Sequence, residues 1–305
     1  MSILSYIKGP GFDWIREQLR TRRAVAQTRH YWDRADRFNP PWRMAGQDEE
    51  NWSSNPLCEF FATRTEGRSV HKWNHYFEIY DRHFSRYRGT DVHVVEFGVA
   101  HGGSLQMWKH YFGPRARIWG IDINPHCKDV EEDQIEILVG DQDDREFLRS
   151  VARAIPRIDI LIDDGGHTMT QQIATFQELF SHVDPHGVYL CEDLHTSYWP
   201  AWGGGHRKRE TFIEYGKRLI DHLHNWHSLQ PKRFPPTDYT RSIHGLHFYN
   251  SVLVIEKRPI GKPVHVESGI GTVRKFRRPE TVWQRAKSRV RDSVHHWTGK
   301  LTKTG

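Results

Sequence analysis

The stretch Ile158-Asp-Ile-Leu-Ile-Asp-Asp-Gly-Gly-His167 is an apolar run that ends abruptly in two acids, two glycines and a histidine. It predicts a buried strand followed by a turn, because apolar residues need burial and glycines permit tight turns. A second run, Val188-Tyr-Leu-Cys-Glu-Asp193, also ends in two acids. In an open α/β sheet, ligands bind beyond the carboxyl ends of the strands. The two stretches therefore predict neighbouring strands whose carboxylates and one imidazole share one edge of a sheet.

Strand-like and helix-like segments alternate on both sides of these two runs. Strands are predicted at 92–98, 117–123, 135–141, 158–163 and 187–192, with helices at 103–111, 143–154, 168–182 and 207–225. The apolar runs 244–250 and 251–258 then predict an antiparallel pair. This alternation is typical of an α/β fold with a doubly wound, mostly parallel sheet, here with an antiparallel terminal strand.

The two ends of the chain differ in composition from a central domain predicted at 61–258. Residues 1–60 are rich in Arg and Trp and contain proline breaks, which predicts a helical N-terminal arm. Residues 257–305 hold thirteen Lys or Arg and three acids, a net charge of +10, so the rest of the chain is negative and the overall +6 comes from this end, most of which is the predicted tail, 259–305. Apolar residues recur in it at helical spacing and predict an amphipathic helix: Trp283, Ala286, Val290, Val294 and Trp297.

A further helix is predicted ahead of the first strand, over residues 70–87. Trp73, Phe77, Tyr80 and Phe84 recur there on one helical stripe, which indicates a core-facing helix.

Composition also bounds the location and the partners of the protein. No stretch approaches the roughly 20 apolar residues of a membrane span, and the first residues lack a secretory apolar region. Three scattered cysteines argue against a disulfide framework and favour a reducing compartment. We expect a cytoplasmic protein whose basic tail either docks on its own domain or contacts the inner face of an anionic membrane. No nucleic-acid reader motif accompanies the charge, so nucleic acid is not an expected partner.

A glycine-containing turn follows the first predicted strand, in Val94-Val-Glu-Phe-Gly-Val-Ala-His-Gly-Gly-Ser104. Such a turn at a helix start lets a small ligand approach the backbone. Asp122 ends the second strand, where an acid can bind both hydroxyls of a ribose. Asp141 stands at the end of the third strand, where it could cap the next helix and also bind a ligand.

The acids after the fourth and fifth strands predict a metal site. Adjacent residues on an extended strand point to opposite sides, so Asp164 rather than Asp163 is the expected ligand. Glu192 and Asp193 follow the neighbouring strand, and three clustered carboxylates repel one another unless a cation neutralises them. Oxygen ligands favour Mg²⁺, or Mn²⁺, over zinc. His167 could take a proton from a hydroxyl bound to that metal, as a general base.

Five ordered motifs resemble those of the metal-dependent sugar O-methyltransferases of the mycinamicin type. These belong to the Rossmann-like class I methyltransferases, which use S-adenosylmethionine. The motifs are Glu96-Phe-Gly-Val-Ala-His-Gly-Gly-Ser-Leu105, Gly120-Ile-Asp-Ile123, Gly140-Asp-Gln142, Ile162-Asp-Asp-Gly-Gly-His167 and Glu192-Asp-Leu-His-Thr-Ser-Tyr-Trp-Pro200. The resemblance covers roughly residues 60–255 and leaves out both ends.

The resemblance implies an O-methyltransferase that moves the methyl group of S-adenosylmethionine to a sugar hydroxyl with the help of Mg²⁺. It implies metal ligands at Asp164, Glu192 and Asp193 and a general base at His167. The positions implied to bind the cofactor are Glu96, Gly98, Gly102, Ser104, Asp122, Asp141, Gln142 and Asp163.

The resemblance implies a sugar hydroxyl of a glycan or a glycosylated natural product as the acceptor, and the basic, Trp-bearing tail also permits a glycolipid. Tyr198 and Trp199 would form a loop wall against the sugar, unless they only pack internally. A homo-oligomer is compatible with the sequence. The alternatives are a cephalosporin hydroxylase-like oxygenation enzyme, a catechol-type O-methyltransferase, and a non-enzymatic scaffold, which the intact acids and His167 disfavour.

Overall fold

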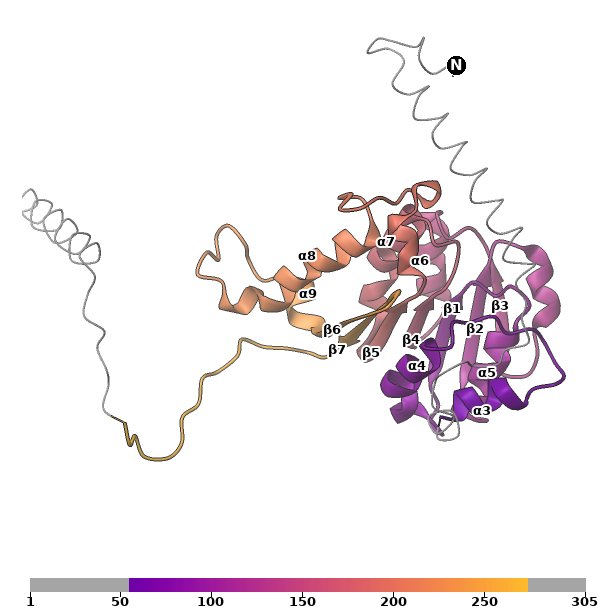
Figure 1. Ribbon diagram of the computed structural model, residues 1–305, viewed down its shortest axis with the longest axis horizontal. Helices are drawn as coiled ribbons and strands as arrows, with labels where there is room; N and C mark the ends of the chain where they lie inside the picture. Colours follow the sequence, from indigo (N-terminus) through magenta and orange to yellow (C-terminus); the bar gives the residue numbers. More distant parts are fainter. Residues whose placement is uncertain (1–54, 274–305) are drawn as a thin grey trace, which may run out of the picture. The chain divides into compact units, whose positions relative to one another are not determined.

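The computed structural model describes residues 55–273, which form a seven-stranded sheet with helices on both faces (Figure 1). The strand order is β3-β2-β1-β4-β5-β7-β6. The strands are β1 His93–Phe97, β2 Arg117–Asp122, β3 Ile135–Val139, β4 Ile158–Asp163, β5 Val183–Cys191, β6 Ile243–Tyr249 and β7 Val252–Lys257. Strand β7 runs antiparallel to both of its neighbours, whereas β1 to β5 pair in parallel. The doubly wound, mostly parallel sheet with an antiparallel terminal strand is confirmed.

The helices form one layer on each face of the sheet, as Figure 1 shows. One layer contains α3 (Pro56–Thr63), α4 (Tyr76–Phe84) and α5 (Gly103–Phe112), and the other contains α6 (Arg145–Ala154), α7 (Met169–Leu179), α8 (Phe212–His224) and α9 (Asp238–Ser242). Short 3₁₀ helices are η3 Ser85–Tyr87, η4 Pro125–Val130, η5 Phe180–His182, η6 Leu194–Tyr198, η7 Pro200–Trp202 and η8 Asn225–His227.

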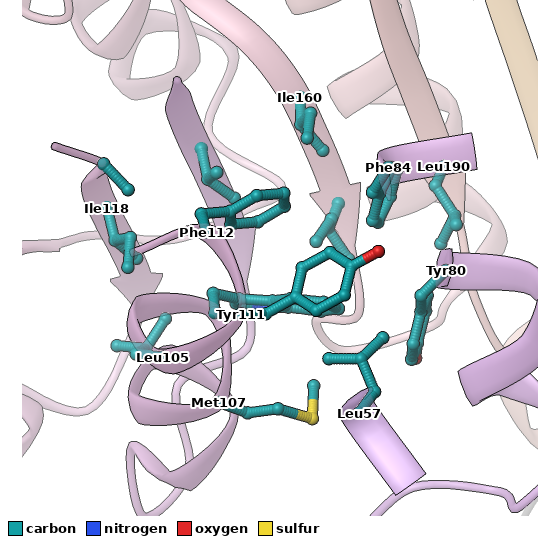
Figure 2. Packing of buried hydrophobic residues seen from close by; sticks show 14 of the residues in the cluster. Leu57, Tyr80, Phe84, Leu105, Met107, Tyr111, Phe112, Ile118, Ile160 and Leu190 are labelled. Atoms are coloured by element: carbon teal, nitrogen blue, oxygen red, sulfur yellow. The ribbon is translucent and has the colours of Figure 1, made fainter. Parts of the chain in front are cut away.

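Each face of the sheet has its own apolar core, because successive strand residues point to opposite sides. Ile160 packs in the layer with α3, α4 and α5, whereas the next residue, Leu161, packs in the layer with α6, α7 and α8. Figure 2 shows the first of these cores, with Leu57, Tyr80 and Phe112 among its members. Burial on both sides explains why the parallel strands read as continuous apolar runs in the sequence.

Helix α4 begins at Tyr76, so the predicted helix over 70–87 is too long at its start. Phe77, Tyr80 and Phe84 are buried as expected, but Trp73 lies outside the helix and is 53% exposed. The segment before α4 carries Lys72, whose ammonium group contacts acids at the carboxyl edge of the sheet. These contacts hold the segment in a non-helical path.

Other element ends also differ from the predicted ones. Helix α8 begins at Phe212 rather than at residue 207, because the Thr211 side chain caps it by accepting a hydrogen bond from the backbone of Glu214. Strand β5 begins at Val183, four residues early, and its pairing with β4 is irregular between Val183 and Val188.

The predictions for the N-terminal arm and the amphipathic tail helix concern mainly residues 1–54 and 274–305, which lie outside the described part. The predicted boundary at residue 60 falls within α3, whose Leu57 is fully buried. The chain divides into two compact units after Lys262, and residues 263–273 have no regular secondary structure. Cys58, Cys127 and Cys191 are free thiols. Within residues 55–273, the helices are too short or too polar to cross a bilayer.

Candidate active site

The carboxyl ends of β1, β4 and β5 lie side by side. Phe97 pairs with Asp163, and Asp163 pairs with Cys191. Backbone hydrogen bonds extend this ladder one residue further, from Asp164 N to Phe97 O (3.1 Å) and from Glu192 N to Asp163 O (2.9 Å). The fold thereby brings the acids after β4 and β5 to the edge where the glycine turn begins.

The turn after β1 fits against the backbone of β4. Gly98 has φ +89°, and a Cβ atom on it would lie 2.0 Å from the carbonyl oxygen of Asp164. Only glycine avoids this overlap. Asp122 fixes the turn from the β2 side, because its Oδ2 accepts hydrogen bonds from Val99 N (2.9 Å) and Ala100 N (3.2 Å). Gly102, with φ +75°, is the N-cap residue of helix α5.

Asp164, His167 and Asp193 form one group whose ligand atoms all lie within 4.8 Å of one another. Nε2 of His167 is 3.9 Å from Oδ1 of Asp164 and 3.6 Å from Oδ2 of Asp193. His167 and Asp193 adopt φ of +56° and +54°, a strained conformation for residues other than glycine. Thr196 stabilises both turns by donating to the carbonyls of His167 and Asp193 (2.9 Å each).

A buried lysine lies among the acids. Nζ of Lys72 is 3.1 and 3.0 Å from the two carboxylate oxygens of Glu192 and 3.3 Å from Oε1 of Glu96, and it also contacts Asp164. Burial alone would lower the pKa of Lys72, but the charges of Asp164 and Glu192 outweigh burial and raise that pKa well above its usual value. Lys72 therefore stays protonated and balances part of the negative charge.

Sequence reasoning missed Lys72. Its partners Asp164 and Glu192 lie 92 and 120 residues further along the chain, and no local pattern marks the lysine.

Glu192 and Asp193 differ in their surroundings. The carboxylate of Glu192 is buried and accepts a hydrogen bond from Tyr80 (2.7 Å) as well as from Lys72. Burial and the neighbouring charge of Asp164 raise the pKa of Glu192 well above its usual value. Asp193 accepts from the hydroxyl of Tyr76 (2.8 Å) and faces His167. Glu192 thus lies beside the group of three and is held by other side chains.

Glu96 and Ser104 form a buried pair beneath the turn. The Ser104 hydroxyl and the Trp108 indole donate to Oε2 of Glu96, at 2.8 and 3.1 Å. Burial raises the pKa of Glu96, and the charge of Lys72 opposes this shift.

Asp163 points away from Asp164, as the alternation of strand residues predicts, and is fully buried. Its carboxylate accepts hydrogen bonds from Nε2 of Gln142 (2.6 Å) and from the hydroxyl of Tyr189 (3.2 Å). The other side-chain atom of Gln142, Oε1, accepts a hydrogen bond from Gly166 N (3.0 Å). Burial raises the pKa of Asp163 to about 6. These bonds tie the end of β3 to the turn before His167.

Asp141 is exposed, and its side chain accepts from the backbone of Asp143. The N-cap of α6 is Asp144, which accepts from two backbone N–H groups. The N-cap role predicted for Asp141 was therefore wrong, since the helix starts later than expected.

An aromatic group borders the acids on η6 and η7. The ring of Trp199 lies 4.5 Å from that of His195 and 5.2 Å from that of Trp202, and Trp73 reaches His195 from the segment before α4 (6.1 Å). Tyr198 is 50% exposed. Trp73 and His195 were not among the predicted site residues, because their proximity to Trp199 arises only in the folded chain.

The residues present fit a hard divalent cation. Asp164 and Asp193 offer carboxylate oxygens on neighbouring strand ends, with Glu192 adjacent, and such oxygens are the ligands that Mg²⁺ prefers.

No protein-family model matches the chain, but known proteins are similar to it. The chain is 39% identical over 256 residues to the 8-demethyl-8-alpha-L-rhamnosyl tetracenomycin-C 2'-O-methyltransferase of Streptomyces olivaceus, covering 74% of this chain and 66% of that protein. It is 41% identical over 188 residues to the mycinamicin VI 2''-O-methyltransferase of Micromonospora griseorubida, covering 58% of this chain and 47% of that protein.

A solved structure similar to the chain is the MycE methyltransferase of the mycinamycin biosynthetic pathway in complex with Mg and SAH. The TM-score is 0.60 at 38% identity, with 67% of this chain and 54% of that chain covered. The chain spans between about half and two thirds of the length of the curated relatives. From these identities and the shared fold, the chain belongs to the family of metal-dependent sugar O-methyltransferases that use S-adenosylmethionine.

Proposed function

We propose that the chain is an S-adenosylmethionine- and Mg²⁺-dependent O-methyltransferase that acts on a sugar hydroxyl of a glycosylated small molecule or glycan. The observation that carries the proposal is the convergence of Asp164, His167 and Asp193 next to the turn at Gly98. The relatives support it, because they are named as O-methyltransferases of glycosylated natural products.

The cofactor would lie across the carboxyl ends of β1 and β2. Asp122 stands there beside Ile123, which is 65% exposed, and Val139 at the end of β3 is also exposed. An acid next to exposed apolar side chains suits a nucleoside, because the acid can bind the ribose hydroxyls and the apolar groups can pack on the adenine. Glu96 and Ser104 lie beneath the turn after β1, and they would contribute to cofactor binding by holding that turn in position.

Asp164 and Asp193 would hold the Mg²⁺ ion, with Glu192 as a third ligand if it exchanges its bonds to Lys72 and Tyr80. When bound, the ion would orient the acceptor oxygen and lower the pKa of the hydroxyl. Lys72 would balance the remaining negative charge beneath the site.

His167 would be the general base. Its ring sits between two carboxylates, and its Nδ1 atom is buried without a hydrogen-bond partner. A base fixed by its backbone near the acceptor hydroxyl would need little reorganisation before it takes the proton. The sulfonium of the cofactor is already activated, so alignment and proton removal are the main tasks left to the protein.

The acceptor would rest on Tyr198 and Trp199, since flat apolar rings next to polar groups suit the faces of a sugar. The free thiols support our proposal of a cytoplasmic location. We propose two further properties that this reaction does not require. One is contact of the basic tail with a membrane surface, and the other is formation of a homo-oligomer.

The test is an acceptor screen read by mass spectrometry, with S-adenosylmethionine and Mg²⁺ present. We expect glycosylated acceptors to gain one methyl group and EDTA to abolish the gain. Methylation of catechols alone would favour the catechol-type alternative. Oxygen-dependent gain of a hydroxyl group would favour the cephalosporin hydroxylase-like alternative.

A further inference from the structure

A second group of metal-ligating side chains lies between α4 and the β6–β7 hairpin. His83, His247 and Glu256 each offer one ligand atom, and these atoms lie within 4.8 Å of one another. The group is separate from the acids at the carboxyl edge. Glu256 pairs with Val188 in the sheet, whereas it is Leu253 that pairs with Cys191, so the group lies three residues, about 10 Å, from that edge.

The strand alternation explains why these residues meet. Glu256 lies on the same face of β7 as Val254, which packs in the core that contains α4. His83 is on the last turn of α4 and is buried. His247 lies beside Val254 in the antiparallel pairing of β6 with β7.

The distances match those between ligands of one metal ion. Nδ1 of His83 is 3.0 Å from Oε1 of Glu256, and Nε2 of His247 is 3.6 Å from Oε2 of the same carboxylate. Zinc bonds of about 2.0–2.1 Å in a tetrahedral arrangement place neighbouring ligand atoms about 3.3 Å apart. The two observed distances lie on either side of this value, so small side-chain shifts would complete the coordination.

One atom of the group lacks a partner. Nε2 of His247 is buried and makes no hydrogen bond, although buried polar atoms are normally paired. At 3.6 Å the carboxylate of Glu256 is too far for a hydrogen bond. His83 is already positioned, because its Nε2 bonds to the hydroxyl of Tyr249 at 2.9 Å. A hydrogen bond of this kind on the outer nitrogen orients metal-ligating histidines.

The protonation states suit a metal. Burial lowers the pKa of His83, which leaves its imidazole neutral near pH 7. Burial would raise the pKa of Glu256, but its hydrogen bond to His83 and the neighbouring basic groups together lower that pKa, so the carboxylate is ionised.

We infer that His83, His247 and Glu256 bind a zinc-class divalent ion, with the fourth position open to water. Two imidazoles and one carboxylate are a donor set that zinc accepts in proteins. Mg²⁺ prefers oxygen ligands and would not compete here. A pocket of about 300 Å³ lies next to the group, with Glu256 in its lining.

The bound ion would fasten α4 to the hairpin. Helix α4 also carries Tyr76 and Tyr80, which hold Asp193 and Glu192 by hydrogen bonds. Binding at the second group would therefore stabilise the helix that supports the acids, whatever reaction those acids serve.

The test is titration of tag-free, metal-stripped full-length protein with ZnCl₂, read by competition with a zinc indicator. Saturating Mg²⁺ in the buffer keeps the acids at the carboxyl edge occupied. We expect micromolar or tighter binding, weakened at least tenfold in His247→Ala and Glu256→Gln. His244→Ala is the matched control, because His244 is an exposed histidine on the same strand outside the group. It should bind zinc like the unaltered chain, and so should Asp164→Asn.

A second readout is the melting temperature. Zinc should raise it in the unaltered chain and in His244→Ala but not in His247→Ala, because an ion bound only by the folded state stabilises that state. Equal zinc affinity in His247→Ala and the unaltered chain would overturn the inference. Loss of binding in Asp164→Asn would also overturn it, since it would place the zinc among the other acids.

Discussion

Lys72 shows how one residue can set the charge balance of a site. Its ammonium group is buried among Glu96, Asp164 and Glu192, where an unpaired carboxylate would be costly. A divalent cation bound on the solvent side would neutralise the negative charge of the same acids. The lysine therefore lets the chain fold before the metal binds.

Replacing this lysine tests that role. Lys72→Met should lower the free energy of unfolding by about 3–5 kcal/mol, because it leaves buried carboxylates without a counter-charge. Mg²⁺ should restore part of the loss. Urea denaturation with and without Mg²⁺ measures both effects. Lys109→Met is the control, since Lys109 pairs with Glu132 in a partly exposed bridge and should cost at most about 1 kcal/mol. Equal losses in the two variants would contradict the account.

The role of His167 predicts a separation of turnover from binding. His167→Ala should lower the turnover number by about 10²–10⁴-fold, the usual contribution of a general base. Affinity for S-adenosylmethionine should stay nearly the same, because His167 lies beside Asp164 and Asp193 after β4, outside the ends of β1 and β2 where the cofactor is proposed to lie. Steady-state kinetics and calorimetry measure the two quantities. A parallel fall in both would show that His167 supports the site as a whole and is not its base.

Asp163 predicts a pH dependence of stability. Its pKa of about 6 in the folded state lies above the unfolded value near 4. The folded state therefore holds this proton more tightly, and the resulting stabilisation is complete below pH 4 and is lost as the pH rises through 6. The stability of Asp163→Asn relative to the unaltered chain should rise by about 2 kcal/mol from pH 4.5 to pH 7. Chemical denaturation at both values measures this change, and a difference that does not vary with pH would refute it.

For single residues, the sequence could predict which acids face the proposed metal site, but not which side chains form hydrogen bonds or ion pairs with them. The alternation of strand residues separates Asp163 from Asp164, and the structure has them on opposite sides. The partners Lys72, Tyr76 and Tyr80 come from the segment before β1, and periodicity there indicates only burial. Long-range contacts of this kind are not encoded in any local spacing.

Among the elements, strands were the most predictable, because burial on both faces makes them continuous apolar runs bounded by polar residues. Helix ends were less predictable. Trp73 continues the apolar stripe of α4 although the helix starts at Tyr76, since periodicity cannot show where other contacts draw the chain out of the helix. The start of α6 was also hard to predict, because either Asp141 or Asp144 could cap the helix and only the structure shows that Asp144 does.

The turn between β1 and α5 gives a prediction at this scale. Gly98→Ala should destabilise the protein by several kcal/mol and weaken cofactor binding, because the new Cβ would overlap the carbonyl of Asp164. Gly113→Ala is a matched control, since Gly113 has nearly the same φ, +88°, and its added Cβ meets nothing within 4 Å. It should show only the backbone strain of about 1–3 kcal/mol, because Gly113, with ψ −173°, adopts a conformation that side chains disfavour. Denaturation and calorimetry compare the two variants, and equal effects would mean that close packing of the turn is unimportant.

At the scale of the whole molecule, the apolar cores of the described part, residues 55–273, are built from residues 57–255. If these residues form complete cores, removing residues 280–305 should leave cooperative unfolding and cofactor affinity unchanged. If the basic tail binds membranes, the same deletion should abolish association with anionic liposomes in a flotation assay. Retained association and unchanged acceptor turnover would refute the membrane role of the tail.

Methyl transfer requires that this fold bind S-adenosylmethionine. Calorimetric titration of the purified protein tests this directly, with S-adenosylmethionine, with its demethylated product and with NAD as ligands, in Mg²⁺ and again in EDTA. We expect micromolar-range binding of the first two ligands and no binding of NAD. If neither S-adenosylmethionine nor its product bound under either condition, the protein would not be a methyltransferase of this kind.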